Sequence, residues 1–378
     1  MNDPESLLFQ LVSIDSVNPR LVPGARGEAE IGAYVAEWLD RKGLEVQRQE
    51  TGSPGRENVI AVARGTGGGR SLLLNAHMDT VGVAGMSAPF QPAIRDGKLF
   101  GRGAMDTKGA LAAFMSAAAE ARALKLRGNV ILTAVVDEEY ASEGTEAVAR
   151  DWKPDAAIVG EPSGLQIVTE HKGFVWFRIE TAGVAAHGSL PDVGVDAIMK
   201  MGKALGALEG LGARLRASAP HRTLGTGSLH ASLISGGQEL SSYPASCRLD
   251  VERRTIPGET ADSSEFEIRR ALDGIGVQDP GFKATLERTF ARNPMEARRD
   301  SAIVAALAEQ VRRVTGAPAV FSGMSGWLDS ALLDGAGIPT VVLGPSGAGL
   351  HGIEEWVDLH SVRECRDITL GTIVDFCR

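Results

Sequence analysis

Residues 72–81 read LLLNAHMDTV, an apolar run that passes directly into His77 and Asp79. Successive side chains of a strand point to opposite faces, so these two residues, two positions apart, project to the same side. Two interpretations are open: a strand end that simply meets solvent, or a pair of side chains placed for chemistry. The other strands decide between them, because a functional site would draw polar residues from several strand ends.

Apolar strands and helices alternate on both sides of this stretch. An alanine-rich helix is predicted over residues 106–124, and an amphipathic helix within residues 27–46 stops at Gly43, a typical helix C-terminal glycine. The alternation predicts an α/β domain with a mostly parallel central sheet. Its strands are near-continuous apolar runs of the buried type, at residues 58–65, 71–76, 129–136, 156–160 and 340–344.

The middle of the chain has a different pattern. Apolar and polar residues alternate at 174–183, 228–237 and 246–255, as in half-exposed antiparallel strands. Helical patterns near 194–211 and 261–273 lie between these strands. We therefore expect a smaller α+β domain at 174–290, inserted into an α/β domain that consists of residues 1–173 and 291–378.

The composition excludes several classes of protein. The formal net charge of −9 and the absence of a basic run argue against nucleic-acid binding. Cys247, Cys365 and Cys377 are widely separated and predict neither a disulfide framework nor a thiolate zinc site. The first residues lack the pattern of a signal peptide, and no apolar run reaches the ~18 residues of a membrane span. A cytoplasmic protein without a membrane partner is expected.

Acidic residues and histidines follow the predicted buried strands where each strand ends. In open α/β sheets, ligand sites lie outside the carboxyl ends of the strands. We therefore expect one edge of the sheet to gather two histidines and several carboxylates. These residues are His77, Asp79, Asp106 at the head of the alanine-rich helix, Asp137, Glu138, Glu139, Glu161 and His351.

Two imidazoles with carboxylates and no thiolate suit divalent ions, zinc above all, with cobalt or manganese as alternatives. The acids outnumber the needs of one catalytic zinc ion, which usually has three protein ligands. A pair of ions bridged by one carboxylate would give a ligand role to more of these acids. Such a pair polarises a carbonyl and activates water near neutral pH. A remaining carboxylate can then move the proton.

Each of these features has a plainer explanation when it is taken alone. An acidic triplet such as 137–139 is usually a solvated turn, Asp106 suits a helix N-cap, and His351 between glycines suits an ordinary loop. The features occur together at one end of the predicted sheet, and separate explanations account poorly for that coincidence.

The chain resembles the family of dinuclear zinc metallopeptidases that includes acetylornithine deacetylase, succinyl-diaminopimelate desuccinylase, aminoacylase and carboxypeptidase G. The resemblance covers nearly the whole chain, with the motifs in the family's order and at its spacing. They are NAHMDTV (75–81), GRGAMDTKGALAAF (101–114), DEEYASEGT (137–145), VGEPSGLQIVTEHKG (159–173), AAHGS (185–189), RRTIPGE (253–259) and GLHGIEEWV (349–357).

The resemblance implies a role for each matching residue. Asp106 would bridge two metal ions, and Glu138 would be the general acid and base rather than a ligand. Asp79 would orient the ring of His77, as carboxylates beside ligating histidines do. The other ligands would form two pairs, His77 with Glu161 on one ion and Glu139 with His351 on the other.

The resemblance also implies a zinc-peptidase α/β fold interrupted by a lid domain that often forms dimers, so a homodimer through 174–290 is expected. In this lid, His187 would steady the oxyanion and Arg254 would hold a substrate carboxylate, a task that suits a guanidinium. The chain departs from many relatives at Ser241, where asparagine is common, and at Trp327, where smaller polar residues are common. Substrate specificity is therefore not carried over.

The leading hypothesis is a metal-dependent amidohydrolase that removes an N-acyl group from a small amino acid. A dipeptidase or a carboxypeptidase G-like exopeptidase is the alternative with the same chemistry. A binding protein without metal is disfavoured because every ligand position and Glu138 are intact. A serine or cysteine hydrolase is disfavoured because the chain has no G-x-S-x-G turn between strand and helix and no matching cysteine motif.

Overall fold

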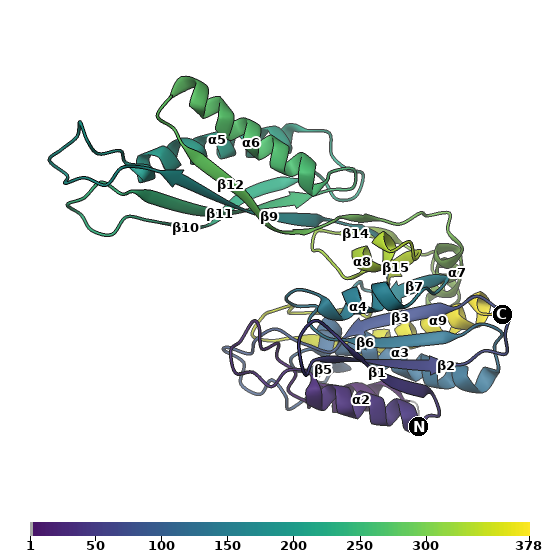
Figure 1. The fold of residues 1–378 in the computed structure, drawn as a ribbon. Helices are drawn as coiled ribbons and strands as arrows, with labels where there is room; N and C mark the ends of the chain where they lie inside the picture. The colour runs from purple at the N-terminus through teal and green to yellow at the C-terminus, as the bar shows by residue number, and fades with distance from the viewer. Residues whose placement is uncertain (1–2) are drawn as a thin grey trace. The chain divides into compact units, whose positions relative to one another are not determined.

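The computed structural model describes residues 3–378 and divides them into two compact units (Figure 1). Unit 1 comprises the residues up to Thr169 together with Ala297–Ser322 and Leu328–Arg378. Unit 2 comprises Glu170–Glu296 and the short segment Gly323–Trp327. Unit 2 contains the whole of the stretch 174–290, whose alternating pattern indicates an inserted domain.

Most of a nine-stranded sheet belongs to unit 1; its order is β1-β2-β6-β3-β7-β15-β8-β13, with β14 also paired to β8. The sheet is mixed: β6, β3, β7 and β15 run parallel, and antiparallel strands flank them on both sides. Only the middle is therefore parallel. The strands are β1 (Glu45–Glu50), β2 (Glu57–Ala63), β3 (Leu72–His77), β6 (Val130–Val135), β7 (Ala156–Val159), β8 (Ile167–His171), β13 (Met295–Glu296), β14 (Phe321–Met324) and β15 (Thr340–Val342).

Helices cover both faces of this sheet, because its parallel strands are apolar on both faces. One core joins Leu74 of β3 to apolar side chains of five helices, α1 (Pro4–Val12), α2 (Ala29–Arg41), α3 (Gly109–Ala121), α7 (Ala302–Thr315) and α9 (Leu359–Phe376). The side chain of Asn75 points to the other face of the sheet, where it donates a hydrogen bond to Thr145 of α4 (Glu143–Asp151). Helix α4 packs against α8 (Ser330–Gly335). Unit 1 thus has three layers.

Short elements complete unit 1. A small antiparallel sheet has the order β16-β17-β5-β4, made of β4 (Ala93–Arg95), β5 (Lys98–Phe100), β16 (Gly347–Ala348) and β17 (Trp356–Asp358). Residues Ala104–Lys108 form an irregular helical turn before α3, and Arg122–Leu124 form a 3₁₀ turn after it. Helix α3 therefore begins three residues later than the sequence pattern predicts, which leaves Asp106 in the irregular turn and not at the helix N-cap.

Unit 2 is a four-stranded antiparallel sheet, ordered β10-β11-β9-β12, with two helices packed on one face. Alternation explains this arrangement, since Val175, Phe177 and Ile179 of β9 are buried against the helices while the residues between them face outward. The elements are β9 (Gly173–Ala182), α5 (Ala197–Ala217), β10 (Ser228–Gly236), β11 (Ser246–Thr255), α6 (Ala261–Gln278) and β12 (Ala284–Arg292).

Candidate metal centre

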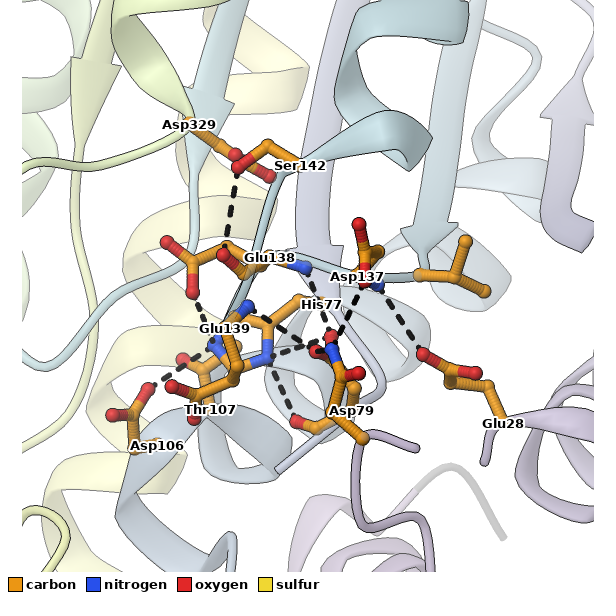
Figure 2. Close-up of polar contacts among 12 residues, drawn as sticks. Glu28, His77, Asp79, Asp106, Thr107, Asp137, Glu138, Glu139, Ser142 and Asp329 are labelled. Carbon is orange, nitrogen blue, oxygen red and sulfur yellow. Dashed lines mark hydrogen bonds and ion pairs between the residues drawn. The ribbon is translucent and has the colours of Figure 1, made fainter. Parts of the chain in front are cut away.

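The four parallel strands β3, β6, β7 and β15 bring their carboxyl ends to one edge of the sheet. Strand β3 pairs with β6 on one side and β7 on the other, and β7 pairs with β15. Residues that follow these strands therefore lie together although up to about 270 positions separate them in the sequence. Figure 2 shows His77, Asp106, Glu138 and Glu139 gathered at this edge.

Asp106 lies between two histidines. Its Oδ1 is 3.1 Å from Nε2 of His77, and its Oδ2 is 3.3 Å from Nε2 of His351. The irregular backbone of Asp106, with φ −115° and ψ 92°, directs the carboxylate toward both rings, and the peptide bond that follows is cis. One carboxylate that offers each oxygen to a different imidazole has the arrangement of a ligand shared by two metal ions.

The other predicted ligands complete this cluster. Nε2 of His77 lies 3.8 Å from Oε1 of Glu161 and 3.9 Å from Oε2 of Glu138. Nε2 of His351 lies 3.3 Å from Oε2 of Glu139. Donor atoms within 4.8 Å of one another form two sets that could hold an ion, His77 with Glu138 and Glu161, and His77 with Asp106 and Glu139.

The donor chemistry of the cluster fits divalent metal ions. Imidazole and carboxylate are zinc ligands, and cobalt and manganese accept the same set. Nδ1 of His77 donates its proton to the main-chain oxygen of Asp79 at 2.9 Å, which leaves the lone pair of Nε2 for a metal. Oε1 of Glu139 is buried and has no hydrogen-bond partner among the described residues, as expected of an atom that coordinates an ion.

Burial and crowding change the proton affinity of the cluster. Burial, together with neighbouring acids, raises the pKa of Glu138 and Glu161, and it raises the pKa of Glu139 to about 7. Hydrogen bonds with Asp106 and Glu139 raise the pKa of His351 to about 10. The same crowding of acids around two imidazoles is the charge arrangement that a divalent cation would stabilise.

Asp79 holds the acidic loop through its carboxylate. Oδ1 accepts a hydrogen bond from the main-chain N–H of Glu138 at 3.1 Å, and Oδ2 accepts one from Glu139 at 3.2 Å. Oδ2 also accepts from Nδ2 of Asn18 at 2.8 Å. The carboxylate lies 3.6 Å from the ring of His77, which contacts the carbonyl of Asp79 instead. Asp79 thus orients three site residues: His77 through its main chain, and Glu138 and Glu139 through its side chain.

Several residues of the site's support were not singled out from the sequence. Nδ2 of Asn18 also donates to Asp137 at 3.1 Å, and Nη1 of Arg56 donates to the same carboxylate at 2.6 Å. Arg56 in turn forms an ion pair with buried Glu28. Asp137, the first acid of the triplet, is therefore a structural anchor. No local signal marks Asn18, because its partners lie 61 and 119 positions away.

Asp329 is a further buried acid near the cluster. It accepts a hydrogen bond from the hydroxyl of Thr145 at 2.5 Å, and burial raises its pKa to about 6. Its charge contributes to the raised pKa of Glu138 and Glu161. Figure 2 places it beside Ser142, above Glu138. Asp329 lies within GMSGWLDSALL (323–333), a segment in which only Trp327 was singled out from the sequence.

The two residues predicted to contact substrate belong to unit 2. His187 is exposed, and its Nδ1 bonds with the hydroxyl of Ser189 at 2.8 Å. Arg254 donates from Nε to Glu252 at 2.7 Å, and its guanidinium carbon lies 5.2 Å from the ring centre of Phe174. Neighbouring Arg253 is buried and paired with Glu259 and Glu267, in a structural role. The catalytic role of His187 and the substrate-binding role of Arg254 remain predictions.

A sequence profile of peptidase family M20/M25/M40 matches residues 73–375, a range that covers most of the chain and includes all five predicted metal ligands. This chain belongs to peptidase family M20/M25/M40. Members of this family hydrolyse amide bonds, and the chain is accordingly a hydrolase of the metallopeptidase and amidohydrolase class. The family fold also accounts for the mixed central sheet with a separate antiparallel sheet.

Individual similar proteins match nearly the whole length of the chain. An acetylornithine deacetylase from Myxococcus xanthus is 29% identical over 98% of this chain and 96% of its own length. The aminopeptidase PepT from Bacillus cereus superposes with a TM-score of 0.81 at 19% identity, over 100% of this chain and 98% of its own. A dinuclear metal-binding M20 peptidase from Bacillus subtilis gives 0.75 at 17% identity, covering 98% and 97%. These structures establish the shared fold.

None of the helices within residues 3–378 combines the length and the apolar character that a membrane span requires.

Proposed function

We propose that this M20 chain is a dinuclear-metal-dependent deacylase that cleaves the amide bond of a small N-acyl amino acid. The observation that carries the proposal is the position of Asp106, whose two carboxylate oxygens face His77 and His351. The choice of a deacylase rests on the full-length likeness to an acetylornithine deacetylase, since the structural matches share only the fold.

The ligands would divide between two ions. His77 and Glu161 would hold one ion and Glu139 and His351 the other, with Asp106 shared. Zinc is the metal that this donor set favours, and cobalt or manganese could replace it. When bound, the ions supply Lewis acidity toward the acyl carbonyl and lower the pKa of water.

Glu138 is suited to move the proton during hydrolysis. It lies 3.9 Å from Nε2 of His77, and its main chain is fixed by Asp79. Burial raises its pKa, which makes the carboxylate a stronger base than an exposed one. Glu138 would take the proton of the attacking water and deliver it to the amide nitrogen, so that the C–N bond breaks to a carboxylate and a free amine.

Unit 2 would contribute contacts to substrate and to a second subunit. Arg254 would hold the amino-acid carboxylate with the Nη edge of its guanidinium, since Nε is already bonded to Glu252. His187 would donate a hydrogen bond to the negative charge that develops on the oxygen of the acyl carbonyl group. We also propose a homodimer through this lid, because Leu233 and Ile234 are exposed on the sheet-edge strand β10.

A cytoplasmic location completes the proposal. Its support is that Cys247, Cys365 and Cys377 are all buried and free, as in proteins of reducing compartments.

The test combines metal analysis with a substrate panel. Metal content per chain would be measured after gentle purification, and hydrolysis of N-acetylornithine, N-succinyl-diaminopimelate and dipeptides would be assayed before and after chelation. About two ions per chain, with activity that disappears on chelation and returns with metal, is expected. Cleavage of dipeptides alone would replace the deacylase by an exopeptidase, and failure to bind any metal would contradict the proposal.

A further inference from the structure

The turn that carries Asp106 is held by a buried side chain from a distant segment. Glu355 is only 1% exposed, and both of its carboxylate oxygens accept hydrogen bonds from residues 102–106. Oε2 accepts from Nη1 of Arg102 at 2.8 Å and from the main-chain N–H of Gly103 at 3.0 Å. Oε1 accepts from the main-chain N–H groups of Met105 at 2.9 Å and Asp106 at 3.1 Å.

These bonds supply acceptors to main-chain N–H groups at the start of the helical segment, where the first four N–H groups have no intrahelical partner. Buried main-chain N–H groups require acceptors, and the irregular turn Ala104–Lys108 provides none for Met105 and Asp106. A carboxylate offers about four acceptor positions, and four donors fill them here. Glutamine could not serve equally, because its amide group would present N–H groups to two of these donors.

Arg102 joins the same turn to the segment that bears His351. This arginine is 2% exposed, and Nη2 donates to the main-chain oxygen of Gly352 at 2.9 Å while Nη1 contacts Glu355. The main-chain oxygen of Glu355 also accepts from the N–H of Gly101 at 3.0 Å. The buried pair therefore clamps two segments together, one ending in Asp106 and the other beginning with His351.

We propose that Glu355 is a positioning residue that sets the shared carboxylate of Asp106 relative to His351. The inference rests on the proposed two-metal function. Asp106 and His351 are the ligands that this clamp aligns, whereas His77 and Glu161 come from strand ends that it does not contact. Loss of Glu355 would therefore weaken the ion held by Glu139 and His351 more than the ion held by His77 and Glu161.

Titration calorimetry of metal-free protein with Zn²⁺ tests this proposal, and the absorption spectrum of the Co²⁺-loaded protein reports ligand geometry independently of activity. In Glu355→Gln, one of the two binding steps is expected to lose on the order of 10–100-fold in affinity, with the other step changed far less. Glu354→Gln is the matched control, because Glu354 is the exposed neighbour in the same segment.

Two further variants separate positioning from general stability. Gln310→Ala removes a buried side chain that bonds to Asp375 away from the centre, so it should lower stability without changing either affinity. Arg102→Lys keeps the charge and loses the bond to Gly352, so it should weaken the same binding step less strongly. If Glu355→Gln does not fold, Arg102→Lys is used for the test in its place.

The outcomes distinguish the inference from the function on which it rests. If wild-type protein binds fewer than two ions, the two-metal function fails. If wild-type protein binds two ions and the affinities of Glu355→Gln match those of Glu354→Gln, only the positioning role is overturned. Equal weakening of both steps would also overturn it, since the clamp would then act on the whole fold.

Discussion

At the scale of single residues, the metal centre concentrates acids in a largely buried place. Asp106, Glu138, Glu139 and Glu161 lie around His77, which is 1% exposed. Charges of one sign destabilise such a site unless a cation or protons offset them. Acids that are adjacent in the sequence can therefore have different functions, because each contacts a different side chain.

Glu138 and Glu139 provide a direct comparison of these roles. Glu138→Gln should lower kcat by on the order of 10²–10⁴-fold with little change in KM, because proton transfer is lost while the ligands remain. Glu139→Gln should instead lower metal content, since it removes a carboxylate that faces His351. Steady-state kinetics with metal analysis on both variants checks this. Equal metal loss in the two variants would contradict the assignment.

His171 gives a pH dependence of stability that is separate from the centre. Burial lowers its pKa to about 4, against an ordinary value near 6.5. The unfolded chain therefore binds a proton that the folded chain excludes. The contribution of neutral His171 is complete above about pH 6.5 and falls as the pH drops toward about 4, with a total loss of about 3 kcal/mol.

Urea unfolding of metal-free wild type and His171→Gln at roughly pH 7.5 and roughly pH 5 measures this effect. Wild type should lose about 2 kcal/mol more than the variant between the two conditions. The use of metal-free protein makes the titration of the metal centre common to both chains. An equal loss in the two proteins would show that His171 does not titrate as its burial indicates.

At the scale of elements, the sequence predicts the candidate ligands that follow the strands. It does not predict the residues that hydrogen-bond to them and hold them in place. Apolar runs locate β3, β6, β7 and β15, and parallel pairing then brings the predicted ligands to one edge. Asn18 and Glu355 carry no such signal, because their partners lie 61 to 253 positions away. Strands of two or three residues, such as β4 and β16, are too short for a period to be recognised.

The flanks of the central sheet show a related limit. An apolar run identifies a buried strand but does not give its direction, so β2 could not be recognised as antiparallel to β6. Strand β8, with the sequence IVTEH, has no continuous apolar run and was not predicted as a strand. Asp106 shows the converse case. Its motif gave a ligand role by resemblance, whereas the irregular turn that aims its carboxylate depends on hydrogen bonds to a remote segment.

Gly160, between β7 and Glu161, allows the strand end and α3 to approach closely. A Cβ there would lie 2.8 Å from Ala110 and 2.8 Å from Phe114, both in the core. Gly160→Ala should lower the free energy of unfolding by about 1–3 kcal/mol through overpacking. Gly274→Ala, at an exposed position of helix α6, meets nothing within 4 Å and should be neutral or stabilising. Denaturant unfolding of both variants checks this, and equal effects would contradict it.

At the scale of the whole molecule, the lid sheet has two edges of different character. Strand β12 carries Glu287, Arg288 and Arg292, whereas β10 has exposed Leu233 and Ile234 and no acidic, lysine or arginine residue. Charged side chains keep sheet edges apart, and uncharged apolar edges pair readily. The proposed homodimer should therefore form through β10.

Light scattering with size-exclusion chromatography tests this arrangement. Wild type should be a dimer, and the double variant Leu233→Lys, Ile234→Lys should be a monomer that keeps its metal content. Val277→Lys is the control, because Val277 is an exposed apolar residue on α6, away from β10. A monomeric wild type, or a dimeric double variant, would refute the β10 interface.

The pairing of β8 with β13 has a consequence for the way such chains diversify. His171 lies opposite Met295 and Glu170 lies opposite Glu296, so the chain leaves for the lid and returns from it at facing residues. In terms of connectivity, the lid occupies the place of a hairpin loop. Recombination at these two facing points would exchange residues 172–294, all of the lid sheet and its two helices, as one continuous segment, and apart from the facing residues themselves only Gly323–Trp327 of unit 2 would stay behind.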